Sequence, residues 1–146
     1  MKKILSLMVI SILLNSATFS QNNEQHEKIN VPAIVKSPLY KKYPEAKKVT
    51  WEKENGNYEA NWGGNSGEDN SVQFTSSGGF IEIVKAIPIN ELPKQVFTYV
   101  NEHYKGSKIT ETGKVTNTSG KTSYEAEVKG KDVIFDENGN FIKAEK

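Results

Sequence analysis

Several short stretches carry side chains whose types and spacing could support catalysis or metal binding. The sequence GNSGE, residues 64–68, resembles a G-x-S-x-G nucleophile elbow, but its last position is Glu68 and no predicted strand leads tightly into a helix there. His26 and His103 each lack a second histidine at ligand spacing, and the chain has no cysteine to complete a zinc site. The sequence therefore predicts no catalytic residue, no metal ligand and no cofactor, and we expect the protein not to be an enzyme.

Acidic residues are the remaining candidates for chemistry. The pairs Glu52/Glu54 and Glu125/Glu127 alternate along predicted strands, and we interpret them as solvated partners of neighbouring lysines and not as an acid–base pair. The segment DENGN, residues 136–140, has the composition of a calcium loop, but its spacing lacks the glycine and the glutamate that such a loop needs. The loop GEDN, residues 67–70, is a further place where a cation could bind.

A turn explains DENGN better than a cation site does. Asn138-Gly139 and Asn55-Gly56 are dipeptides typical of type I′ hairpins, in which both turn residues need a positive φ. Ser77-Gly78 occupies the corresponding place earlier in the chain and keeps the glycine without the acids. The bend is the shared requirement, so we predict a hairpin whose carboxylate Asp136 has no counterpart in the earlier copy.

These residues lie in a pattern that occurs twice. Val31-Pro32 and Phe80-Ile81 recur 61 residues later as Leu92-Pro93 and Phe141-Ile142, and the length differences between the copies fall in predicted loops. Each copy predicts one helix followed by four strands, because apolar residues recur first at helical spacing and then at period two. We predict repeat one over residues 31–84, a connector over 85–91, and repeat two over 92–146.

The two helices differ in their patterns. In the second, the residues at helical spacing are Val96, Phe97, Val100 and Tyr104, which predicts a core-facing stripe. In the first, Pro38 is unfavourable inside a helix, so we predict Ser37 as the N-cap and residues 32–36 as a separate turn.

Together the elements predict an α+β fold. One unit of about 60 residues buries too little surface alone, so we expect the two repeats to form one curved antiparallel sheet with the helices on one face. We place four strand aromatics in the core, namely Tyr58, Phe74, Tyr124 and Phe135. Trp62, beside the glycine-rich loop, and Trp51 are the candidates for contact with a partner.

The N-terminus indicates export. Lys2 and Lys3 precede an apolar run, and Thr18 and Ser20 fit the small-residue positions before a cleavage site. We expect a signal peptide over residues 1–20, cleavage near Ser20/Gln21, a flexible leader over 21–30, no membrane anchor after cleavage, and a periplasmic or secreted product. Loss of Lys2 and Lys3 changes the formal net charge from +1 to −1, and the chain contains no arginine, so nucleic acid is not an expected partner.

The repeated order of Val31-Pro32 or Leu92-Pro93, Tyr43-Pro44, Trp51, Tyr58 and Phe135-Asp136 resembles the PepSY-like, beta-lactamase-inhibitor-like family of small exported bacterial proteins. The resemblance covers residues 31–146. It implies a two-repeat fold whose open sheet face could hold a polypeptide, and it does not imply that this chain inhibits a beta-lactamase.

Two functions are compatible with the sequence. The first is a non-enzymatic binding module, an inhibitor-like protein that engages an envelope or secreted protein. The second is a periplasmic carrier of a small ligand or cation, which would use the sheet face or the loop at residues 67–70. The sequence does not identify the partner or the oligomeric state.

Overall fold

The computed structural model describes residues 29–145, so the predicted signal peptide, its cleavage site and most of the leader lie outside the described part. The elements are α1 (Ala33–Lys42), β1 (Thr50–Glu54), β2 (Asn57–Trp62), β3 (Asn70–Phe74), β4 (Phe80–Ala86), η1 (Ile89–Glu91), α2 (Lys94–His103), β5 (Ile109–Asn117), β6 (Thr122–Val128), β7 (Lys131–Asp136) and β8 (Phe141–Glu145).

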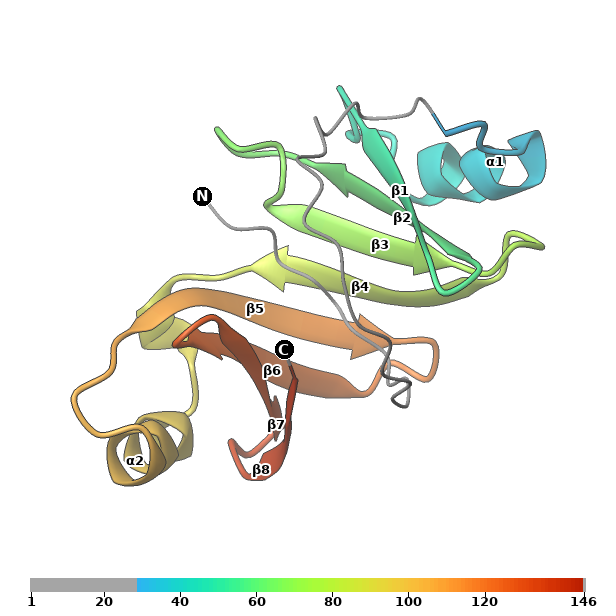
Figure 1. Cartoon of the computed structure of the whole chain (residues 1–146). Helices are drawn as coiled ribbons and strands as arrows, with labels where there is room; N and C mark the ends of the chain where they lie inside the picture. The colour runs from blue at the N-terminus through green and yellow to red at the C-terminus, as the bar shows by residue number, and fades with distance from the viewer. Residues whose placement is uncertain (1–28, 146) are drawn as a thin grey trace, which may run out of the picture.

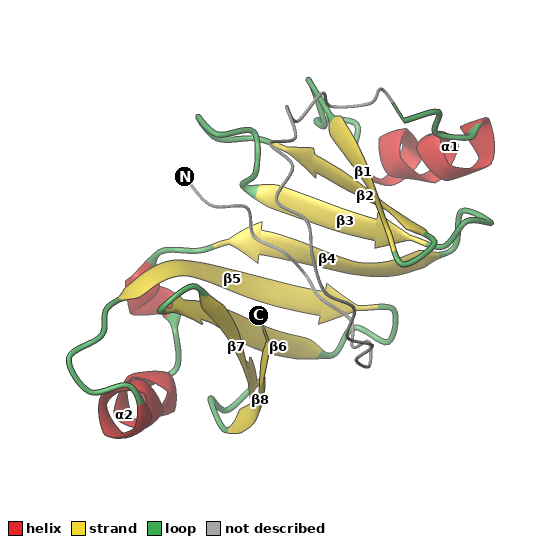
Figure 2. Cartoon of the chain, in the orientation of Figure 1, coloured by secondary structure: helices red, strands yellow, loops and turns green. Residues whose placement is uncertain are grey.

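The eight strands form one antiparallel sheet in sequence order, β1 to β8. Figures 1 and 2 show this sheet as a continuous curved layer, with α1 beside the first strands and α2 beside the last ones. The two repeats are joined by the antiparallel pairing of β4 with β5. The paired residues run from Glu82↔Asn117 to Ala86↔Gly113. The predicted α+β fold, two helix–four-strand repeats sharing one antiparallel sheet, is therefore confirmed.

The two helices occupy equivalent positions. Each has ten residues, each is preceded by a proline at the N-cap, Pro32 or Pro93, and each is followed by a tyrosine at the C-cap, Tyr43 or Tyr104. Proline suits this place because its missing N–H would have no partner inside the helix. No helix within residues 29–145 has both the length and the apolar character needed to span a membrane.

The start of the first helix differs from the prediction. Helix α1 begins at Ala33, so residues 33–36 are helical, Ser37 is not the N-cap, and Pro38 lies inside the helix. A proline there cannot donate to the carbonyl of Ile34, four residues earlier. The turn at Gly78 lies against this carbonyl of Ile34. The closing hairpin of repeat one therefore contacts α1 at the turn of the helix where Pro38 cannot donate a hydrogen bond.

Each repeat has its own hydrophobic cluster between its helix and its half of the sheet. The first cluster includes Val35, Leu39 and Phe74, and the second includes Val96, Val100 and Phe135. The core assignments of Tyr58, Phe74 and Phe135 are confirmed, and Tyr124 is partly buried against the second cluster. Phe97 is 38% exposed, so the apolar stripe of α2 is narrower than its spacing predicts.

The hairpin turns confirm part of the turn prediction. Asn55 and Gly56 both have positive φ, +50° and +83°, as a type I′ turn requires. At residues 136–140 only Gly139 has positive φ, +84°, so the type I′ assignment is wrong there. The Gly139 amide donates to the Asp136 carbonyl (3.0 Å) and the Asp136 amide donates to the Asn140 carbonyl (2.9 Å), which is a three-residue hairpin loop closed by a glycine.

The same loop closes repeat one, where Gly78 donates to Thr75 and Thr75 donates to Gly79. Both loops also lie against a helix start. A Cβ on Gly139 would lie 2.8 Å from the Cβ of Pro93 and 3.1 Å from that of Gln95. The closing glycine of each repeat is therefore required by its φ and by its contact with the helix of the same repeat.

We predict that Gly139→Ala destabilises the protein more than Gly120→Ala. Gly120 closes a hairpin loop with the same hydrogen-bond pattern at φ +78°, and a Cβ there meets nothing within 4 Å. Gly120→Ala should therefore cost only the left-handed backbone conformation, about 1–2 kcal/mol, while Gly139→Ala adds the collision with α2. Equal losses of unfolding free energy for the two variants, measured by chemical denaturation, would show that the contact with Pro93 does not contribute to stability.

The side chain of Asp136 acts as a hydrogen-bond acceptor for its loop. Its Oδ1 accepts from the amides of Asn138 (2.9 Å) and Asn140 (2.8 Å), and its Oδ2 accepts from Nδ2 of Asn140 (2.9 Å). In the same way, Asn117 Oδ1 accepts hydrogen bonds from two backbone amides, and Thr75 Oγ1 accepts one from the amide of Gly79. Thr75 is thus the counterpart in repeat one that the sequence did not suggest.

We predict that Asp136→Asn lowers the melting temperature less than Asp136→Ala, because asparagine keeps the acceptor. The hydrogen bonds from Asn140 lower the pKa of Asp136, so this stabilisation is present above the ordinary pKa of about 4 and is lost as the pH falls below it. Thermal melts of the three proteins at pH 7 and pH 3, with calcium and with chelator, provide the measurement. A melting temperature that rises with calcium only when Asp136 is present would contradict the turn.

Candidate functional site

The face of the sheet opposite the helices carries the acidic residues of the strands. Ala60, Val72 and Phe74 point toward α1, so the residues between them point the other way. We call this side the acidic face. Its acidic residues are Glu52, Glu54, Glu59, Glu82, Glu125, Glu127, Asp132, Asp136 and Glu145 by register, with Glu111 beside the bulge in β5.

The strand lysines follow the opposite rule. Lys53, Lys85, Lys114 and Lys131 lie on the helix-bearing side, and among the strand residues described only Lys143 lies on the acidic face. Lys143 is paired with Glu145, at 2.5 Å between Nζ and Oε1. A chain with almost no net charge therefore has a strongly acidic surface, because the alternation of the strands separates the two signs.

The acidic face is concave. Glu145 on β8 contributes to the raised pKa of Glu54 on β1, although these strands are at opposite edges of the sheet. In a flat sheet the two edges would be about 33 Å apart, which is far beyond the screening length of about 10 Å. Side chains of β3 and β4 also line one cavity with side chains of β8, so the sheet curls and the open face predicted from the sequence is hollow and not flat.

In repeat one, the buried carboxyl group on this face is hydrogen-bonded. Glu59 is 4% exposed and lies across from Gln73, which is also buried. The hydroxyl of Ser71 donates to Oε1 of Glu59. Burial raises the pKa of Glu59 to about 7 even though this hydrogen bond acts in the opposite direction.

In repeat two, a second carboxyl group takes the place of the hydroxyl. Glu125 corresponds to Glu59 and is also 4% exposed, while Asp132 corresponds to Ser71. Burial raises the pKa of Glu125 to about 8, and Asp132 is the first of the neighbouring carboxyl groups that raise it further. Burial also raises the pKa of Asp132 to about 6, with contributions from Glu127, Glu111 and Glu145.

The hollow contains a cavity of about 230 Å³ lined by strands of both repeats. Glu125 lies at this cavity together with apolar residues, and its lining residues are Gln73, Ile81, Glu82, Val115, Ser123, Glu125, Ile134, Ile142, Lys143 and Glu145. Ile81 and Ile142 come from equivalent bulged segments of β4 and β8, where the register shifts beside Phe74 and Phe135. The cavity thus combines an apolar wall with carboxyl groups.

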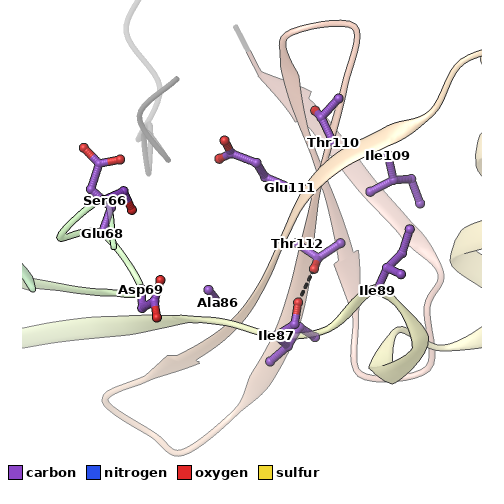
Figure 3. A pocket seen from close by; sticks show the side chains of 10 residues that line it. All are labelled: Ser66, Glu68, Asp69, Ala86, Ile87, Ile89, Ile109, Thr110, Glu111 and Thr112. Carbon is purple, nitrogen blue, oxygen red and sulfur yellow. Dashed lines mark hydrogen bonds between the residues drawn. The ribbon is translucent and has the colours of Figure 1, made fainter. Parts of the chain in front are cut away.

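A second cavity of about 430 Å³ lies between the loop before β3 and the start of β5 (Figure 3). Glu68 and Asp69 from the predicted cation loop line it together with Glu111. Thr112 Oγ1 donates a hydrogen bond to the carbonyl of Ile87, and both residues line the cavity. In residues 29–145 no three His, Cys, Asp or Glu side chains converge closely enough to hold a metal ion.

The structure places the two candidate tryptophans on the helix-bearing side. Trp62 is 4% exposed and its ring lies 5.4 Å from that of Tyr43, so the expectation that it is available at the surface is corrected. Trp51 is partly buried, with its ring 6.4 Å from that of Phe74. Neither residue is part of the acidic face.

The remaining sequence candidates occupy other parts of the fold. Residues 64–68 form a loop between β2 and β3, and no helix follows it, as expected for a segment that is not a nucleophile elbow. His103 lies exposed in the last turn of α2, stacked on Tyr99 with ring centroids 4.0 Å apart. His26 lies outside the described residues.

The environment of one strand carboxyl group differs from the prediction. The sequence pattern predicts Glu125 as a solvated partner of lysine, but Glu125 is buried among carboxyl groups. The signal that could have revealed this was the recurrence of YEA at residues 58–60 and 124–126, which places a glutamate at the same strand position in both repeats. Its burial depends on the curl of the sheet, which alternation alone does not show.

We predict that Glu125→Gln stabilises the protein at alkaline pH. In the folded state Glu125 keeps its proton up to about pH 8, while in the unfolded chain it loses it near its ordinary value. Between these pH values the folded state holds more protons, so wild-type stability falls as the pH rises. Thermal melts from pH 5 to pH 9 should show a gain for Glu125→Gln that grows with pH. The exposed Glu102→Gln serves as control, and parallel curves for the two variants would contradict the burial of Glu125.

Comparison with known proteins supports the architecture. The profile of the beta-lactamase-inhibitor-like, PepSY-like family matches the chain twice, over residues 19–81 and 63–143. No functionally curated protein matches the chain.

Solved structures share the fold at low sequence identity. A "putative periplasmic" protein from Bacteroides eggerthii superposes with a TM-score of 0.68 at 19% identity, covering 80% of this chain and 88% of its own. A DUF2874 family protein from Bacteroides uniformis has a TM-score of 0.66 at 24% identity, covering 77% and 87%. A BLIP-like protein from Bacteroides fragilis has a TM-score of 0.60 at 23% identity, covering 80% and 86%.

These matches share the fold of this chain and show no enzymatic activity for it. Because the family profile covers more than half of the chain and matches each repeat, the chain belongs to the beta-lactamase-inhibitor-like, PepSY-like family.

Proposed function

We propose that this protein is an exported, non-catalytic binding protein that engages a segment of polypeptide on the acidic face of its sheet. The supporting observation is the hollow itself, a cavity of about 230 Å³ lined by β3 to β8 and therefore built from both repeats. Its apolar side chains, such as Ile134 and Ile142, would contact a partner, and the surrounding polar groups would orient it. Inhibition of an envelope or secreted enzyme is the finer form of this proposal.

Export is supported by the layout of residues 1–20 and by the similarity to proteins assigned to the periplasm. A role without catalysis is supported by the sequence, which has no cysteine and no convincing nucleophile motif. On the helix-bearing side, the strand aromatics Trp62 and Phe74 are buried under α1, so they are not available as anchors for a partner.

The alternative is a carrier of a small ligand or cation. The second cavity supports it, because Glu68, Asp69 and Glu111 bring three carboxylates to one opening (Figure 3). It is the weaker candidate, since these groups do not form a metal-binding cluster within residues 29–145. A melting temperature raised by a metal ion or metabolite would favour it, because a ligand that binds only the folded state stabilises that state.

We predict that a photo-crosslinking amino acid at Ser123 captures a protein partner in envelope extract, while the same group at Thr98 does not. Ser123 lines the cavity of the acidic face, whereas Thr98 is exposed on α2. Equal capture at both positions, or capture at Thr98 alone, would contradict a binding site on the acidic face. Mass spectrometry of the crosslinked species identifies the partner.

A further inference from the structure

We infer that the polypeptide segment bound on the acidic face is cationic, with a lysine or arginine side chain that enters the hollow and pairs with Glu125 and Asp132. This inference rests on the proposed function and specifies the chemistry of the partner. Its first support is the separation of charge, since all acidic strand residues lie on this face and Lys143 is the single basic strand residue described there. Such a surface attracts a partner of the opposite charge.

The second support is the difference between the repeats at one position. In repeat one, Ser71 donates a hydrogen bond to the buried Glu59. In repeat two the donor is replaced by Asp132, which is another acceptor at neutral pH. The exchange of Ser71 for Asp132 therefore removes the hydroxyl that donates to the buried glutamate in repeat one, and it leaves a place for an external donor in repeat two.

Within residues 29–145, no cationic side chain contributes to the pKa shift of Glu125. The groups that shift its pKa within residues 29–145 are carboxyls, namely Asp132, Glu82, Glu145 and Glu59, in addition to burial itself. Lys143, which lines the same cavity, is engaged by Glu145. Glu125, which is 4% exposed and surrounded by other carboxyl groups, therefore lies at a hollow in which residues 29–145 provide no counter-ion for its carboxylate.

The shape of the hollow fits a long cationic side chain. Val115, Ile134 and Ile142 line it with apolar surface, and Glu125 lies beside them. Lysine and arginine have apolar stems and a charged end, so the stem would contact the isoleucines and the charged end would reach Glu125. Asp132 lies beside Glu125 and lines a small second cavity with it. A bare metal ion would need several converging oxygen ligands, and residues 29–145 contain no such cluster.

Binding of a cation should release protons. Burial keeps Glu125 protonated up to about pH 8 and Asp132 up to about pH 6 in the free protein. A nearby positive charge favours the ionised carboxylate, so a cationic segment displaces a proton from Glu125 when it binds at pH 7. The affinity for such a segment therefore increases as the pH rises from 6 to 9.

The experiment uses titration calorimetry of the purified protein with an octalysine peptide capped at both ends. We expect saturable binding at pH 7, with release of about one proton, measured from the difference in heat between phosphate and Tris buffers. The double variant Glu125→Gln/Asp132→Asn should weaken binding about tenfold or more and abolish the proton release. The matched control is Glu91→Gln/Glu102→Gln, which removes two carboxylates, and so at least as much negative charge at pH 7, from exposed positions outside the acidic face, and it should bind within about threefold of wild type.

Equal weakening in the two double variants would overturn the inference, because it would show attraction to net charge alone. Absence of octalysine binding, or displacement of the peptide by calcium, would also overturn it. The melting temperature of each variant confirms that it is folded. If crosslinking at Ser123 captures a partner while octalysine does not bind, the proposed binding function stands and the cationic chemistry is wrong. If octalysine binds and no partner is captured, the site is cationic-selective and the protein partner is contradicted.

Discussion

The register of the eight-stranded sheet is the constraint on which the other features of this protein depend. Successive side chains on a strand point to opposite faces, so a slip of one residue between two strands would exchange the faces of everything beyond it. Here such a slip would place Glu125 beneath α2 and Ala126 in the hollow. The burial of Ala60, Val72, Ala126 and Val133 beneath the helices sets the register, and the position of the carboxyls on the other side follows from it.

The two faces of the sheet have diverged to different degrees. Beneath the helices the repeats are nearly interchangeable, because Val35 and Leu39 pack on the sheet as Val96 and Val100 do. A helix that must pack on a sheet tolerates few changes of volume. The acidic face has no such restriction, and there the repeats differ in chemistry, with Ser71 replaced by Asp132 and Glu82 by Lys143. The asymmetry of the hollow is therefore a property that duplication alone would not produce.

The curl of the sheet converts an acidic face into an acidic hollow. Each repeat has a bulge where its last two strands meet, beside Phe74 and Phe135, and bulges increase the local twist of a sheet. The closing glycines, Gly78 and Gly139, hold the ends of these strands against the helix of the same repeat. Because both halves curl in the same sense, Glu54 and Glu145 approach each other. The same curl shields Glu59 and Glu125 from solvent. The raised pKa values of the buried glutamates are consequences of this shape.

Much of this architecture could be predicted from the sequence, because it depends on local rules. The spacing from Val31-Pro32 to Leu92-Pro93 revealed the repeat, and the alternation of Val72 and Phe74 identified strands with one apolar face. Local rules failed at Pro38, where the neighbouring hairpin accommodates a residue that a helix disfavours, and at Asn138, where the bulge and not the dipeptide sets the turn type. Trp62 and Glu125 were assigned to the wrong environments for one shared reason. Alternation shows which side of a strand a residue occupies, but only the tertiary structure decides what covers that side, and here α1 covers the tryptophan while the curl of the sheet encloses the glutamate.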